Sequence, residues 1–346
     1  MVEVQERIWR DPTHSYLRCF AQRIGVSARG KSRRLQRVLS DFGCEHSFAR
    51  SCARVEEHYG FKLNAPAVRT VTLAQSRRAV KKLEKHYAKS FRSLPARGAS
   101  TLVAQADGTM ICTVEAGRRR KAPRPREWKE MRLVAAQAQG TTQVTYAATM
   151  GSVAEVGRRW GHCARDAGWA LESRIHVVGD GAEWITLQRR EVFGDQATQL
   201  TDFFHVSEYL GAAAEVCRAQ APRAWLRTQQ KRLKRGAVQQ VLEALEPCLE
   251  AATVDDADAP VRAAHRYLSN RLDALDYPAA IAADLPIGSG LIESGHKHVL
   301  HARLKGPGTA WLPANADAIA QLRVLRANDL WDDFWSNSTP PNRHLN

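Results

Sequence analysis

The chain has 346 residues, a formal net charge of +15 and a sequence pI of about 9.8. Its length allows roughly two domains with a sizeable core. No apolar run approaches the roughly 20 residues that a transmembrane helix needs, which argues against a membrane-spanning protein. The basic balance favours a polyanionic partner such as nucleic acid, although an anionic membrane surface or solubility alone would also account for it.

The first residues of the chain and its cysteine pattern indicate the cellular compartment of the protein. Residues 1–7 carry acids and no apolar core, so they do not resemble a secretory signal. The seven cysteines are odd in number and scattered, without a C-x-x-C pair. This pattern is typical of reduced thiols and argues against a zinc site or a disulfide framework. We therefore expect a cytoplasmic protein.

Residues 1–97 are expected to form a helical region. Apolar residues recur at helical spacing after Ser32, and Gly43 is the expected stop. Ser47 can cap a second helix, which is expected to end near Gly60. Asn64 and the proline that follows it predict the start of a third helix.

These helices fit two different structures. Two short helices joined by a glycine-containing turn, the second rich in Arg, Thr and Ser, suit a helix-turn-helix in which Arg69 contacts DNA. An ordinary helical bundle fits the same pattern. Ser76–Ala96 is expected to be a further, basic helix, and Pro95 and Gly98 indicate a domain boundary at its end.

The character of the sequence changes after residue 98. We expect strands at Thr101–Asp107, around Met131–Gln137 and Gln143–Thr149, at Arg174–Gly179 and at Gln199–Phe204. Helices are expected from Ser152 to about Gly168, after Gly181, and from His205 to about Arg218. The order of three strands, helix, strand, helix, strand and helix predicts a five-stranded mixed sheet with helices on both faces. This first part of a catalytic core spans residues 98–218.

Three further segments complete the predicted organisation. Residues 219–284 are helical, mixed in charge and without a chemical motif, so they resemble an insertion. Residues 285–330 contain an acidic residue ahead of a basic, helix-compatible run and are expected to complete the core. Residues 331–346 are polar and contain prolines, which is typical of a flexible tail.

Three carboxylates are the candidate catalytic and metal-binding residues. Asp107 and Asp180 follow predicted strands, and Glu293 lies in Gly288-Ser-Gly-Leu-Ile-Glu-Ser-Gly-His-Lys-His298. Sites in open sheets gather at the carboxyl ends of strands. Mg²⁺ prefers carboxylate oxygens, and two such ions can stabilise the attacking and leaving oxygens of a phosphodiester. We expect Asp107 to bridge two ions, Asp180 to bind one of them and Glu293 the other. A single surface carboxylate or a helix cap is the alternative for each residue, and for Asp180 in particular.

Three motifs follow one another in the chain: Gly179-Asp-Gly-Ala-Glu-Trp-Ile185, Asp202-Phe-Phe-His-Val-Ser-Glu-Tyr-Leu210 and the Glu293 segment extended to Trp311. Together, in this order, they resemble bacterial insertion-sequence transposases of the DDE type, closest to the Kra group. The resemblance covers about residues 30–330. It implies a ribonuclease-H-like core with a helical insertion, and Asp107, Asp180 and Glu293 fall on the family's acidic positions.

The resemblance also implies an activity and its partners. These are metal-dependent cleavage at the terminal inverted repeats of a mobile element and strand transfer into target DNA, by a homo-oligomer assembled on DNA. Mg²⁺ is the implied cofactor, and Mn²⁺ is expected to substitute for it. Such an enzyme would work in the bacterial cytoplasm, at the nucleoid. This sequence lacks the cysteine-rich, zinc-ribbon-like start that related transposases can carry.

Asp202 and His205 form a D-x-x-H pair that several such families carry after the fifth strand. Asp202 is a rival to Asp180 as second metal ligand. We prefer Asp180, because its strand is expected to lie beside the first strand, and we expect Asp202 and His205 to orient a carboxylate, a water or a phosphate. A locally bonded histidine at a helix start is the alternative for His205.

Basic residues near the third acid and in one loop are candidate DNA contacts. A solvated basic surface is the alternative reading for them. In addition to Arg69, the candidates are Lys297, Arg303, Lys305 and the loop residues Arg118, Arg119 and Arg120.

Three functions are compatible with these patterns. The first is an active transposase. The second is an inactive or co-opted DNA-binding protein derived from one. The third is a ribonuclease-H-like nuclease that cuts without joining, and strand-transfer product separates it from the first.

Overall fold

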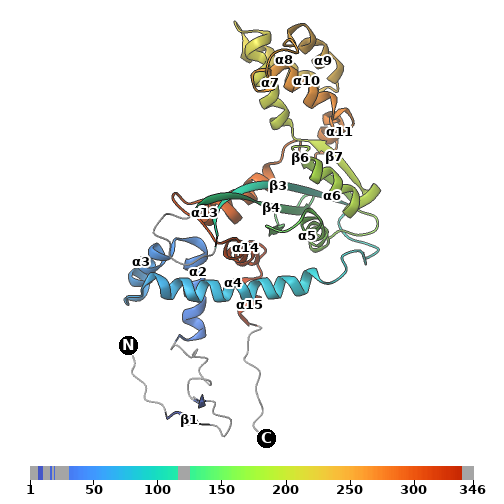
Figure 1. The fold of residues 1–346 in the computed structure, drawn as a ribbon. Coiled ribbons are helices and arrows are strands. Elements are labelled where there is room, and N and C mark those ends of the chain that lie inside the picture. The colour runs from blue at the N-terminus through green and yellow to red at the C-terminus, as the bar shows by residue number, and fades with distance from the viewer. Residues whose placement is uncertain (1–6, 11–15, 18, 20–30, 116–124, 337–346) are drawn as a thin grey trace.

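The computed structural model describes residues 7–10, 16–17, 19, 31–115 and 125–336 (Figure 1). Its centre is a five-stranded sheet with the spatial order β5-β4-β3-β6-β7. The strands are β3 (Thr101–Val114), β4 (Arg126–Ala138), β5 (Val144–Thr149), β6 (Arg174–Gly179) and β7 (Ala197–Thr201). A separate short ribbon pairs β1 (Trp9–Arg10) with β2 (Tyr16–Leu17).

The predicted mixed sheet is confirmed. β5, β4 and β3 pair antiparallel, whereas β3, β6 and β7 pair parallel. The expectation that the first strand ends at Asp107 is wrong, because β3 continues to Val114. The extra residues pair with β4, up to Val114↔Arg126, and Thr113 also forms an isolated parallel bridge with Trp311, while the parallel pairing with β6 stops at Gln105↔Val178. Asp107 therefore lies within a long hairpin but just beyond the parallel part of the sheet.

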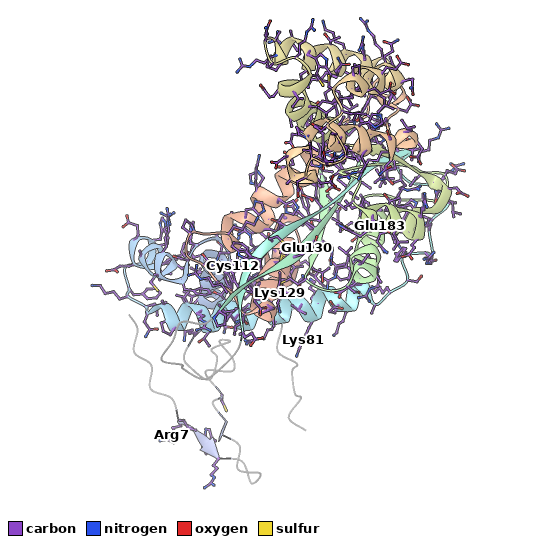
Figure 2. The ribbon with its side chains drawn as sticks, turned by 45° about the horizontal axis from the view of Figure 1, so that its top comes forward. Arg7, Lys81, Cys112, Lys129, Glu130 and Glu183 are labelled. Carbon is purple, nitrogen blue, oxygen red and sulfur yellow. The ribbon has the colours of Figure 1, made fainter. Side chains whose placement is uncertain are left out.

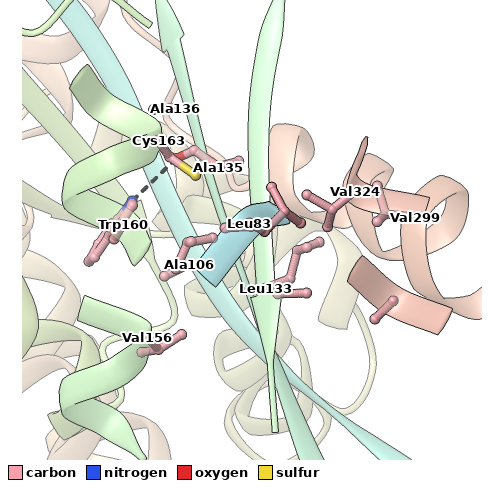
Figure 3. Close-up of a cluster of buried hydrophobic side chains, with 14 of the residues drawn as sticks. Leu83, Ala106, Leu133, Ala135, Ala136, Val156, Trp160, Cys163, Val299 and Val324 are labelled. Carbon is pink, nitrogen blue, oxygen red and sulfur yellow. Dashed lines mark hydrogen bonds between the residues drawn. The ribbon is translucent and has the colours of Figure 1, made fainter. Parts of the chain in front are cut away.

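Helices cover both faces of the sheet. On one side lie α5 (Val153–Asp166) and α6 (Glu183–Phe193), and on the other lies α14 (Pro313–Ala327). Figure 3 shows Trp160 of α5 against the sheet, where its indole Nε1 donates to the carbonyl oxygen of Ala135 at 3.2 Å. Val324 of α14 and Val299 approach Leu133 from the opposite side. Burial of these apolar side chains on both faces is the main stabilising contribution to this layer.

The N-terminal helices are α2 (Arg33–Glu45), α3 (Phe48–Tyr59) and α4 (Ala65–Tyr87). The caps expected at Ser47 and Asn64 are confirmed, since both side chains accept hydrogen bonds from the first turns of their helices, and Ser32 caps α2 in the same way. The stop expected at Gly43 is wrong. A Cβ atom there would lie 2.0 Å from Oγ1 of Thr72, so the glycine serves the close approach of α2 to α4 rather than a helix end.

The third helix and the basic helix expected to end near Ala96 are one helix. α4 continues to Tyr87, and its inner residues Leu73, Ala79 and Leu83 belong to the same buried cluster as the sheet. The division of the chain at residue 97 and the helix-turn-helix stay predictions. The buried face of α4 nevertheless joins the N-terminal helices to the central layer.

The segment after β7 forms a helical unit at one end of the molecule (Figure 1). It has its own apolar cluster, to which Val178 of β6 and Leu200 of β7 also contribute. The longer helices are α7 (Phe203–Cys217), α8 (Pro222–Lys234), α9 (Val238–Leu245), α10 (Pro260–Ser269) and α11 (Tyr277–Ala282). Short 3-10 turns accompany the core and this unit: η1 (Gly194–Gln196), η2 (Glu246–Cys248), η3 (Asp256–Asp258) and η4 (Leu272–Ala274).

The chain then returns to the sheet. It forms α12 (Gly290–Gly295), a π-helical turn η5 (His296–His301), α13 (Ala302–Leu304), α14 and α15 (Trp331–Ser336). The flexible tail expected over residues 331–346 is wrong for its first part, because α15 buries Phe334 and Trp335, and residues 337–346 lie outside the described residues. α12 and η5 pack against the same face as α14, and a Cβ atom on Gly295 would lie 2.6 Å from the Tyr146 ring. Across the described ranges, no helix combines the length and apolar character that crossing a membrane requires.

Candidate active site

The three predicted acids line one cavity. It has a volume of about 210 Å³ and lies where β3, β6 and the starts of α7 and α12 meet. Besides Asp107, Asp180 and Glu293, its polar lining consists of Asp202, His205, Glu208 and Ser289. Segments separated by 73 residues (Asp107 to Asp180) and 113 residues (Asp180 to Glu293) therefore supply acids to a single small space.

Asp107 and Asp180 reach this cavity because of the sheet register. Gln105 and Val178 are the last parallel pair of β3 and β6, and each aspartate follows two residues later, Asp107 within β3 and Asp180 just past the end of β6. Oδ1 of Asp107 accepts a hydrogen bond from the backbone N–H of Gly108 at 2.7 Å. The expectation that the Asp180 strand lies beside the first strand is confirmed.

Asp180 makes one local hydrogen bond with its side chain. Oδ1 accepts from the backbone N–H of Ala182 at 2.9 Å, just ahead of α6. The backbone carbonyl of Asp180 accepts a hydrogen bond from the Tyr267 hydroxyl of α10. This contact fixes the strand end against the helical unit. Among the described residues, no protein donor hydrogen-bonds to Oδ2 of Asp180.

Asp202 has a different environment from the other acids. It is 3% exposed, and Oδ1 accepts from the backbone N–H groups of Phe204 at 2.6 Å and His205 at 3.1 Å. Oδ2 accepts from the backbone N–H of Ser289 at 2.7 Å and from the Ser289 hydroxyl. Both oxygens are thus occupied by protein donors. The strand expected to extend to Phe204 ends at Thr201, because Asp202 caps α7 instead.

Glu293 is exposed on α12, and Gln105 fixes the start of this helix. The Gln105 amide is fully buried; its Nε2 donates to the carbonyl of Gly288 at 3.1 Å and its Oε1 accepts from the backbone N–H of Ile292 at 2.9 Å. The Ser289 hydroxyl lies 3.4 Å from Oε1 of Glu293. Neither Gln105 nor Ser289 is among the site residues expected from the sequence. Gln105 could have been noticed as the single amide side chain in the apolar run Leu102-Val-Ala-Gln-Ala106.

His205 lines the cavity and also contacts a residue of its own helix. Its ring lines the cavity, and Nδ1 lies 3.3 Å from Oε2 of Glu208, one turn further along α7. The rings of Tyr209 and Tyr267 pack edge-on against it at centroid distances of 5.4 Å and 5.6 Å. The helical unit thereby contributes to the wall of the cavity.

The predicted DNA contacts have different positions. Lys297, Lys305 and Arg69 are exposed, whereas Arg118, Arg119 and Arg120 lie outside the described residues. Arg303 is only 5% exposed, so the expectation that it faces DNA is wrong. Its Nε donates to the carbonyl of Gly43 at 3.0 Å, its guanidinium lies over two aromatic rings (Phe48 and Trp311), and burial lowers its pKa to about 10.

The candidate acids are the type of ligand that a divalent cation prefers, but their side chains do not form a preassembled metal site in the described residues. Carboxylate oxygens are the ligands that Mg²⁺ prefers, and a few suffice because water and substrate complete the octahedron. In the part of the chain that the structure describes, however, no three His, Cys, Asp or Glu side chains converge closely enough to form a metal-binding group. A cation would have to draw the carboxylates around the cavity together.

One face of α4 is a basic surface, and α8 carries a similar row of exposed basic residues, Arg223, Arg227, Lys231 and Lys234. The four most exposed charged residues along α4 are basic, while Glu84, the acid on this helix, pairs with Arg159; Figure 2 labels one of the four, Lys81. We define this face by Arg69, Arg77, Lys81 and Lys85. At a rise of about 1.5 Å per residue, the four residues span about 24 Å of helix.

No protein-family model matches this chain, and no curated protein matches its sequence.

Proposed function

We propose that this protein is a DDE transposase that cleaves DNA at the ends of an insertion sequence and transfers the strands into target DNA. The observation that carries the proposal is the shared cavity of Asp107, Asp180 and Glu293, which come from three distant segments. The resemblance of the three motifs supplies the reaction class. The ribonuclease-H-like relationship of the fold belongs to the same proposal, and its support is the mixed sheet with a helical unit between β7 and α12.

Asp107, Asp180 and Glu293 are the residues that would hold Mg²⁺ or Mn²⁺. When bound, such ions activate the attacking hydroxyl and neutralise charge on the phosphodiester. We assign Asp180 rather than Asp202 as the second ligand. The reason is that four protein donors already occupy the Asp202 oxygens, whereas among the described residues the Asp180 side chain accepts a single hydrogen bond, from the backbone N–H of Ala182.

Asp202 then has a positioning role. Through Ser289 it ties the start of α7 to the turn that leads into α12, and Gln105 holds the same turn from β3. Glu293 is thus presented on a short helix that is anchored at two points. Such anchoring restricts where its carboxylate can move when charge enters the cavity.

DNA would be bound largely through its phosphates. The basic face of α4 and the exposed residues Lys297 and Lys305, which follow Glu293 in the chain, are candidate phosphate contacts. Phosphate contacts of this kind give affinity and orientation without reading sequence. Recognition of the element ends and assembly of a homo-oligomer on paired ends are parts of the proposal that rest on the resemblance.

The test uses duplexes from the native DNA that flanks the gene, with Mg²⁺ or Mn²⁺. Wild-type protein is expected to nick the duplex and to produce strand-transfer product. Asp107→Asn, Asp180→Asn and Glu293→Gln are expected to lose both activities by at least about a hundredfold while binding the duplex normally. Strand transfer that survives these substitutions would refute the assignment, and nicking without joining would indicate a nuclease.

One observation favours the second function, a DNA-binding protein that has lost catalysis. The described acids do not form a preassembled metal-binding group. Such a protein would bind DNA through the same basic surfaces and would show no metal-dependent nicking with any duplex. Metal-dependent nicking that requires Asp107 would exclude it.

A further inference from the structure

The helix that carries Glu293 changes its winding directly beside Asp107. After α12, residues His296–His301 form a π-helical turn, in which hydrogen bonds close over five residues. Residues five apart then lie nearly above one another, and the His296 and His301 rings are stacked with centroids 5.3 Å apart. π turns of this kind occur frequently at functional sites.

His296 is directed at the candidate metal ligand. Its side chain is 5% exposed, and Nε2 lies 3.2 Å from Oδ2 of Asp107. Neither ring nitrogen has a hydrogen-bond partner of good geometry among the described residues. A buried imidazole without a partner is unusual, and the Asp107 carboxylate is the polar group beside it.

Two neighbouring contacts hold the ring in this place. His301, which stacks on His296, has Nε2 3.0 Å from Oγ1 of Thr109 on β3. Gly295 precedes His296 and lets the helix approach the sheet, because a Cβ atom there would lie 2.6 Å from the Tyr146 ring and 2.9 Å from a Leu133 methyl carbon. The histidine pair is therefore fixed by β3 and by close packing of the helix.

His296 does not line the acidic cavity, whereas Asp107 does. His296 is therefore not positioned to bind substrate or metal directly. Its Nε2 lies 3.2 Å from Oδ2 of Asp107, which does line the cavity.

We propose that His296 is a positioning residue that holds the Asp107 carboxylate for divalent cation binding. A small rotation of that carboxylate aligns Oδ2 with Nε2 of His296, which supplies the imidazole with its missing partner. The carboxylate is then restrained from outside the cavity. This inference rests on the proposed function, because it takes Asp107 to be a metal ligand.

The experiment measures Mn²⁺ binding directly, by the loss of the free-ion electron paramagnetic resonance signal, and the Mn²⁺ dependence of nicking. His296→Phe keeps a planar ring without a donor, and His296→Gln places an amide donor near the position of Nε2. His298→Phe is the matched control, because His298 is an exposed residue of the same turn. Thermal unfolding of the metal-free proteins checks that each variant folds, and His296→Leu replaces His296→Phe if the larger ring is not accommodated.

We expect His296→Phe to weaken Mn²⁺ binding by about 10- to 100-fold, the effect typical of residues that orient metal ligands. Nicking should recover at high Mn²⁺, and His296→Gln should restore most of the affinity. Mn²⁺ affinity of His296→Phe within twofold of wild type would overturn the inference alone. Wild-type protein that binds no Mn²⁺ through Asp107 would overturn both this inference and the proposed metal site.

Discussion

Oδ2 of Asp202 accepts a hydrogen bond from the backbone N–H of Ser289 at 2.7 Å, which joins the cap of α7 to the turn four residues ahead of Glu293. The same carboxylate caps α7 through Phe204 and His205. One buried acid thus connects the end of β7, the helical unit and the helix that carries the third candidate ligand.

Asp202→Asn is expected to destabilise the protein by about 1.5–3 kcal/mol, because an amide nitrogen would face one of the backbone N–H donors that now meet a carboxylate. Urea unfolding followed by circular dichroism measures this loss. Asp180→Asn is the control, since its remaining amide oxygen can still accept from Ala182, and a change within about 0.5 kcal/mol is expected. Equal stability of the two variants would contradict the structural role of Asp202.

Gln105→Leu is expected to loosen the start of α12. The substitution leaves the Gly288 carbonyl and the Ile292 N–H without their buried partner, at a cost of about 1–3 kcal/mol for each group. Urea unfolding gives the stability, and hydrogen exchange of the Ile292 amide reports the local opening. Gln137→Leu, at a more exposed position of β4, is the control. Unchanged exchange at Ile292 would argue against anchoring by Gln105.

Removing charge from the basic face of α4 is expected to weaken DNA binding in a salt-dependent manner. For the triple variant Arg77→Ala, Lys81→Ala, Lys85→Ala, the slope of log affinity against log salt should become shallower by up to about 0.9 per lost phosphate contact. Fluorescence anisotropy with a duplex at several salt concentrations measures it. The charge-preserving triple variant Arg77→Lys, Lys81→Arg, Lys85→Arg should retain the wild-type slope. An unaltered slope after charge removal would show that DNA binds to a surface other than the basic face of α4.

Stability is expected to fall in mild acid, in part through His176. Burial lowers the pKa of His176 below its ordinary value of 6.5, although Nε2 lies 2.8 Å from the carbonyl of Pro286. The unfolded chain therefore binds a proton near pH 6.5 before the folded chain does, so the free energy of unfolding decreases as the pH falls below about 6.5. His176→Gln should make this decrease shallower between pH 7 and 5, as urea titrations at each pH would measure. An identical pH profile would show that other groups dominate.

The sequence alone predicts the helices and strands whose ends are determined by residues next to them in the chain. Arg174–Gly179 is expected as a strand and is β6, and Ser47 and Ser152 are expected as caps and accept hydrogen bonds from Arg50 and Glu155. Capping needs only a hydroxyl and the N–H groups of the next turn. The five strands and their alternation with helices follow from the same short-range patterns.

The sequence predicts the position of a residue less well where contacts with distant segments of the chain determine that position. Gly43 has the properties of a helix stop, yet contact with Thr72 makes it an interior residue of α2. Arg303 belongs to a basic run, yet it lies four residues after buried Val299, on the face that packs inward between two aromatic rings. In both cases a tertiary contact overrides the local preference.

For the candidate site, the sequence by itself determined the acids, because Asp107, Asp180 and Glu293 stand beside strand or helix signals that short-range patterns predict. Only the tertiary structure decided that they line one cavity, through the register of β3 with β6 and the return of the chain to α12. It also decided that Asp202 is held by four protein donors and that His296 faces Asp107. Such relations depend on hydrogen bonds and packing between segments far apart in the chain, which no local pattern encodes.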